Sequence, residues 1–71
     1  MSAYQVKVVR HRRKSRPLWE GDQLEEARAA FRLWDGWARS QNDWEIGVEL
    51  EDSEGEFIEW SRYIDGRSVA H

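Results

Sequence analysis

The chain has 71 residues, 39% hydrophobic and 35% charged, with five tryptophans, no cysteine and a net charge of −3. This length supports one hydrophobic core and so a single domain over residues 1–71, and the lack of cysteine excludes disulfides and thiolate metal sites. No apolar run reaches the roughly 20 residues that cross a bilayer, and none follows the charged start as in a signal peptide, so we expect a cytoplasmic protein.

The first predicted element is a strand over residues 4–12. Tyr4, Val6 and Val8 alternate with polar residues, which is typical of a strand with one buried face. A basic loop follows over residues 13–21. It contains Pro17, which has no N–H to donate and therefore ends strand pairing, and Trp19, which we expect to anchor the loop.

A helix is predicted over residues 22–40. Asp22 is a suitable N-cap, and Glu25 three residues later completes a capping-box pattern. At about 100° per residue, the apolar side chains form one stripe, which extends over Leu24, Ala27, Phe31, Trp34 and Ala38. Leu33 and Trp37 lie on the shoulder of this stripe, so Trp37 is either a core residue or an interface residue.

Two further strands, over residues 44–51 and 56–64, are predicted to form a hairpin. A three-residue loop, Ser53 to Gly55, would place glycine in the left-handed position. Counting outward from this loop pairs residue 50 with 58 and residue 48 with 60. This register turns one face toward the helix, formed by Trp44, Ile46, Val48, Leu50, Ile58 and Trp60. Residues 65–71 show no apolar pattern and are expected to be a flexible tail.

These elements predict an α+β domain of β-α-β-β order. Its three-stranded antiparallel sheet would carry the helix on one face, in two layers. The strand over 56–64 is apolar on both faces, so we expect it in the centre of the sheet. In that arrangement Lys7 or His11 would lie beside Glu59 and compensate its charge.

The charges are unevenly distributed along the chain. Residues 1–17 carry +6, whereas residues 41–61 carry −8. One interpretation is that the charges of each segment make its own strands soluble and that the two segments attract each other. The other is that each segment binds a partner of opposite charge.

Two sets of candidate binding residues follow from this pattern. For a protein partner they are the acidic stripe, Glu45, Glu49, Glu51 and Glu59, together with Leu33 and Trp37. For nucleic acid they are the basic segment, Arg10, Arg12, Arg13, Lys14 and Arg16. No aromatic residue is interleaved in the basic segment, and the sequence pI of about 5.3 argues against nucleic acid.

Catalytic chemistry is not indicated. There is no cysteine, and the two histidines, His11 at the basic end of the first strand and His71 at the last position, indicate neither a nucleophilic triad nor a metal-ligand spacing. No glycine-rich phosphate loop is present, and the acidic turn at 52–55 lacks the ligand spacing of a calcium loop. We expect no enzyme activity, no metal and no cofactor.

In size and layout the chain resembles small accessory proteins of phages and mobile elements, including anti-CRISPR-type inhibitors. The resemblance rests on the single first strand, the loop 17–22, the helix beginning at 24–31 and the acidic hairpin. It implies a protein-binding domain that inhibits a host defence complex by covering its surface, in the host cytoplasm. The alternatives are a small nucleic-acid-binding regulator and a self-associating assembly protein, with a homodimer as one form.

Overall fold

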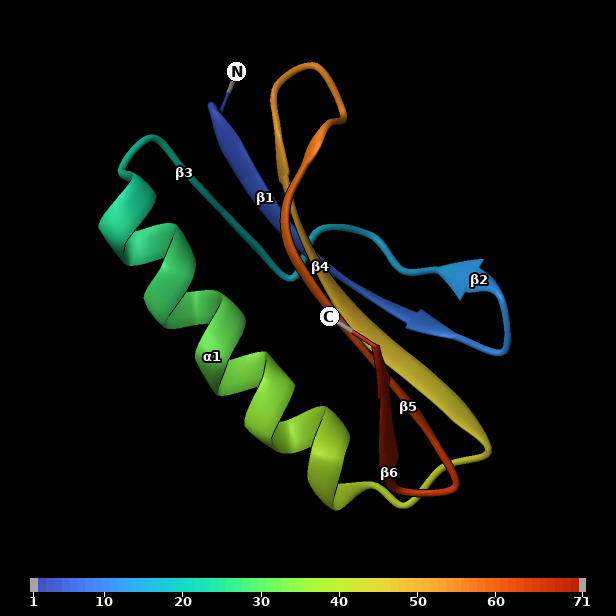
Figure 1. Cartoon of the computed structure of the whole chain (residues 1–71). Helices are drawn as coiled ribbons and strands as arrows, with labels where there is room; N and C mark the ends of the chain where they lie inside the picture. Colours follow the sequence, from blue (N-terminus) through green and yellow to red (C-terminus); the bar gives the residue numbers. More distant parts are fainter. Residues whose placement is uncertain (1, 71) are drawn as a thin grey trace.

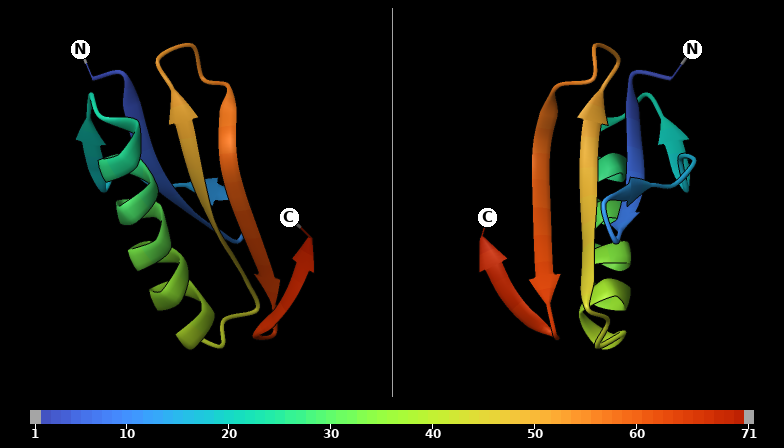
Figure 2. Two further views of the ribbon diagram at one scale, coloured as in Figure 1. Left: turned by 60° about the vertical axis from the view of Figure 1, so that its left-hand side comes forward. Right: turned by 90° about the vertical axis from the view of Figure 1, so that its right-hand side faces the viewer.

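An antiparallel sheet of six strands and one helix form the two layers of the protein (Figure 1). The computed structural model describes residues 2–70. The strands are β1 (Tyr4–Arg10), β2 (Arg13–Lys14), β3 (Trp19–Gly21), β4 (Glu45–Asp52), β5 (Phe57–Ile64) and β6 (Arg67–Ala70). The helix α1 (Leu24–Ser40) lies along one face of the sheet (Figure 2). We call the opposite face the outer face.

The predicted three-stranded sheet with the strand over 56–64 in its centre is wrong. The strand order is β2-β1-β4-β5-β6, with β3 also paired to β1, so β4 is the central strand. The prediction assumed that a central strand must be apolar on both faces. β4 instead buries glutamates on its outer face, and such burial is tolerated because these carboxylates are paired with cations.

The hairpin register is also shifted from the predicted one. Glu51 pairs with Phe57 as counted from the loop, but a bulge then inserts Ile58, so that Leu50 pairs with Glu59 and Glu49 with Trp60. Beyond the bulge every residue of β5 changes face relative to the prediction. One extra residue thus turns Trp60 to the outer face, because the side-chain period of a strand is two.

The core therefore differs from the predicted one at its aromatic residues. Tyr63 is 1% exposed, whereas Trp44 is 56% and Trp60 is 37% exposed, so placing these two tryptophans in the core was wrong. The Tyr63 hydroxyl donates a hydrogen bond to Asp35 Oδ1 at 2.6 Å and accepts one from Arg39 at 3.3 Å. The rest of the core is aliphatic or small except for Phe31, and comprises Val6, Val8, Ala27, Phe31, Ala38, Ile46, Val48 and Leu50.

The helix begins later than expected. Its N-cap is Gln23, which makes no side-chain cap, and Asp22 accepts a hydrogen bond from the backbone N–H of Ala3 instead. Asp22 therefore ties the start of the chain to the loop before the helix. At its other end α1 continues through Gly36 to Ser40.

Three short strands complete the sheet. β2 and β3 both pair with β1, at opposite ends of its free edge, and β6 pairs with the end of β5. Part of the segment expected to be a loop, and part of the expected flexible tail, are thus strands. The turn Asp65-Gly66 that leads into β6 has positive φ at both residues, as a tight hairpin turn requires.

Candidate functional site

The acidic stripe expected to meet a protein partner is not a free surface. Three of its members, Glu45, Glu49 and Glu51, lie side by side on the outer face of β4, with side chains 8%, 17% and 6% exposed. Glu59 lies on the other face because of the bulge, 3.6 Å from Arg28. The structure therefore does not bring the four glutamates together.

Cations from the basic segment and β1 cover the stripe at one end. Lys14 Nζ lies 3.1 Å from Glu49 and 2.9 Å from Glu51, and Lys7 Nζ lies 3.2 Å from Glu51. The Lys14 ammonium also sits 5.1 Å from the centre of the Phe57 ring, within the range of a cation–π contact. The expected compensation of Glu59 by Lys7 or His11 is not found, because Lys7 contacts Glu51 and His11 lies 3.3 Å from Asp43.

These contacts shift two pKa values in directions that favour the charged forms. Burial pushes the pKa of Glu51 upward, but hydrogen bonds from Lys14 and Lys7 outweigh it and the net pKa is lowered. The hydrogen bonds to Glu51 and Glu49 raise the pKa of Lys14. Both shifts favour the ion pair between Lys14 and Glu51.

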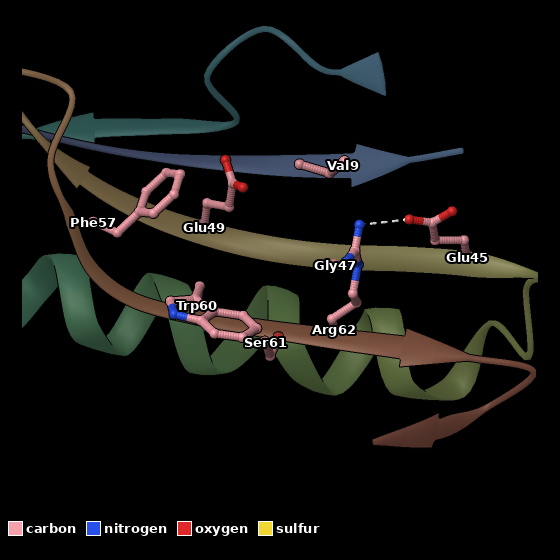
Figure 3. A pocket seen from close by; sticks show the side chains of 8 residues that line it. All are labelled: Val9, Glu45, Gly47, Glu49, Phe57, Trp60, Ser61 and Arg62. Carbon is pink, nitrogen blue, oxygen red and sulfur yellow. Dashed lines mark hydrogen bonds and ion pairs between the residues drawn. The ribbon is translucent and has the colours of Figure 1, made fainter. Parts of the chain in front are cut away.

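The other end of the stripe is neutralised by Arg62. Its guanidinium donates to Glu45 at 2.7 Å, across a shallow hollow on the outer face (Figure 3). Gly47 forms the floor of this hollow between Glu45 and Glu49, and Trp60 and Phe57 lie along its side (Figure 3). Each carboxylate that borders the hollow has a basic partner within the chain.

The basic segment is divided between the two faces of the sheet. Lys14 pairs with Val9 and belongs to the outer face, whereas Arg13 pairs with Arg10 on the helix side. Arg10 Nε lies 2.7 Å from Asp43, and Arg12 lies 4.0 Å from Glu45. Within residues 2–70, Arg13 and Arg16 make no ion pair. The expected nucleic-acid-binding set is thus largely occupied by the chain's own carboxylates.

Leu33 and Trp37, the remaining candidates, are exposed on α1. Leu33 is 74% and Trp37 is 37% exposed, and they are neighbours one helical turn apart. Trp37 packs edge-on against Trp34 with ring centroids 5.5 Å apart, and the Arg10 guanidinium lies 5.7 Å from its ring centre. An interface role for Trp37 therefore fits the structure better than a core role.

An apolar groove runs beside these residues, between α1 and the segment 13–18. Its volume is about 720 Å³. Val8, Leu18, Trp34 and Trp37 supply its apolar lining, and all of its charged lining residues are basic. We use the name helix-side surface for this groove together with the adjoining Leu33.

Sequence reasoning missed several residues of these surfaces. Leu18, 41% exposed, follows a proline in a segment without periodicity, so no pattern marked it. Trp44 was assigned to the core by alternation, yet it stacks on His11 with ring centroids 5.3 Å apart. Trp60 on the outer face could have been found only by recognising the bulge, whereas Phe57 pairs with Glu51 on the outer face, as counted from the loop.

Residues 2–70 contain no group of three or more metal-ligating side chains. Among the same residues, the single helix is too short and too polar to cross a membrane. Comparison with protein-family models, with curated proteins and with solved structures found no match to this chain.

Proposed function

We propose that this protein is a non-enzymatic protein-binding domain and that it binds its partner through the helix-side surface. The observation that carries the proposal is the exposure of Leu33 and Trp37 beside an apolar groove. Large apolar side chains that adjoin a concave apolar lining are typical of protein interfaces, where tryptophan is often a dominant contact.

The distribution of charge supports this choice of surface. The glutamates of β4 are buried and paired, so a cationic partner would have to displace Lys7, Lys14 or Arg62 from them. On the helix side the unpaired Arg13 adjoins the apolar lining instead. A partner that offers an apolar anchor and a carboxylate would match both features.

A domain of this kind acts by covering part of its partner. An inhibitor of a host defence complex, the role implied by the resemblance to phage accessory proteins, would use the helix-side surface for this purpose. The acidic hairpin would then stabilise the fold, because its carboxylates form ion pairs with the lysines of β1 and β2 on the outer face of the sheet.

The proposal is tested by site-specific photo-crosslinking in the cells that produce the protein. Position 33 receives a photoreactive phenylalanine analogue in place of leucine, and the matched control carries it at Arg32, which is also exposed on α1 but points away from the groove. We expect a covalent protein adduct from position 33 and only background from position 32. Equal adduct yields at the two positions, or none at either, would refute the proposal.

Nucleic-acid binding is the second candidate, and one observation favours it. Trp37 and Trp44, both partly exposed, lie against Arg10 and His11, and this combination can stack bases beside phosphates. However, Asp43 already pairs with Arg10 and lies 3.3 Å from His11. Salt-sensitive retardation of a single-stranded oligonucleotide, lost on Arg13→Gln, would establish this candidate in place of the first.

A further inference from the structure

One side of α1 carries a row of four residues, of which three are exposed and one, Ala30, is partly buried against the edge of the core. Glu26, Ala30, Leu33 and Trp37 follow one another at spacings of four, three and four residues. At about 100° per residue they fall within one narrow stripe, adjacent to the buried side formed by Ala27, Phe31 and Ala38. We call this row the helix seam. A 4-3-4 spacing is the one by which two helices pack along a common seam.

The helix seam is complementary to itself when two copies run antiparallel. A two-fold axis midway between Ala30 and Leu33 places the small Ala30 of each copy against the large, 74% exposed Leu33 of the other. The same axis places Glu26 of each copy against Trp37 of the other. A small residue then faces a large one at the centre of the contact, as interdigitated packing requires.

Charge also favours the antiparallel arrangement. Glu26 makes no ion pair within residues 2–70, although it is exposed on the same side of α1 as the groove. Arg13, equally unpaired, lines the groove beside Trp37. Antiparallel packing brings Glu26 of one copy toward Arg13 of the other, twice per dimer. A parallel arrangement would instead place Glu26 against Glu26, which like-charge repulsion disfavours.

We propose that the occupant of the helix-side surface is a second copy of this chain, packed antiparallel along the helix seam about a two-fold axis between Ala30 and Leu33. This inference rests on the proposed function and names its partner. The contact covers Leu33 and Trp37, and it pairs Glu26 with Arg13, two of the charged residues that make no ion pair within residues 2–70. Self-association also adds buried surface to a domain whose own core is small.

Sedimentation equilibrium of the full chain tests the existence of the dimer. We expect the wild-type chain to dimerise reversibly, Leu33→Ser to weaken dimerisation about 30-fold, and Arg32→Ser to leave it unchanged. Both substituted side chains are exposed, so the fold is retained in each variant and circular dichroism verifies it. A wild-type chain that stays monomeric at all accessible concentrations would overturn the inference.

A charge exchange tests the antiparallel register. Glu26→Arg and Arg13→Glu should each weaken dimerisation, by about tenfold, because each leaves two repulsive contacts per dimer. The double variant restores the pairs with reversed sign and should dimerise nearly as well as the wild type. If the double variant is weaker than either single variant, the two residues do not meet and the proposed register is wrong.

The outcomes separate this inference from the proposed function. A monomeric chain that still gives a position-33 adduct with a different protein overturns the second-copy proposal and leaves the proposed function standing. A position-33 adduct of twice the chain mass supports both. A monomeric chain that gives no adduct from position 33 refutes both.

Discussion

Gly47 lies at the centre of the sheet, between β1 and β5, and its substitution tests the register that determines both faces of the protein. A Cβ at this position would lie 2.6 Å from the backbone oxygen of Ser61, an atom that cannot move without shifting β5. Overpacking of this kind costs about 1–3 kcal/mol, and removing the freedom of glycine in the unfolded chain returns about 0.5–1 kcal/mol. Gly47→Ala should therefore destabilise the domain by about 1–2 kcal/mol.

Gly36 provides the matched control. A Cβ there meets nothing within 4 Å, and the residue lies in the exposed interior of α1, so Gly36→Ala should stabilise the domain by about 1 kcal/mol. Urea unfolding followed by tryptophan fluorescence, at a concentration where the chain is monomeric, measures both changes. If Gly47→Ala is as stable as Gly36→Ala, the Cβ has found free space and the β4–β5 register described above is wrong.

Three further predictions concern the charged cluster and the core. Lys14→Met should destabilise the domain by about 1 kcal/mol at neutral pH, since Lys14 is half exposed and Glu51 keeps Lys7. Because the pKa of Glu51 is lowered by folding, ionised Glu51 stabilises the folded state above its unfolded pKa of about 4.3, and this stabilisation is lost as the pH falls through the lower pKa of the folded state. The stabilities of wild type and Lys14→Met, measured by acid unfolding, should therefore converge at low pH. Tyr63→Phe should cost about 2 kcal/mol in urea unfolding, because Asp35 loses its 2.6 Å hydrogen bond; an unchanged midpoint would mean that this bond contributes nothing. Trp60→Ala should reduce the stability in thermal unfolding less than Ile46→Ala does, despite the larger side chain, because Trp60 is 37% and Ile46 only 1% exposed. The reverse order would indicate that Trp60 is buried in the core.

Periodicity located the longer elements of the fold. α1 and the three long strands occupy the segments in which apolar residues recur with the helix or strand period. Each of these segments carries enough residues to reveal its period. β2 and β3, with two and three residues, are too short to show one. The turn before β2 is also hidden, because His11 and Arg12 adopt positive φ without a glycine to mark it.

A stronger signal was available for β6. The pair Asp65-Gly66 is a typical two-residue hairpin turn, and it follows directly after a strand. The residues after it are polar except for the adjacent Val69 and Ala70, so the strand itself shows no apolar alternation. The turn chemistry, and not the hydrophobic pattern, indicates this strand.

The site could be predicted only in part, because the bulge and the charge pairing depend on the tertiary fold. β5 has apolar residues at both parities, so either register buries some of them, and the bulge at Ile58 decides which. Likewise the composition shows a basic and an acidic segment but not that Lys14 reaches Glu49 and Glu51 across β1. The exposed positions of Leu33 and Trp37 could be predicted, because the direction of a side chain around a helix follows from its place in the sequence.

The central claim is that the protein binds through the helix-side surface and that the acidic hairpin does not contact the partner. One photo-crosslinking measurement compares position 33 with position 54, an exposed glutamate at the tip of the hairpin. We predict a protein adduct from position 33, suppressed by Trp37→Ala in the same chain, and background alone from position 54. An adduct from position 54 in the absence of one from position 33 would contradict the account and return the binding surface to the acidic hairpin.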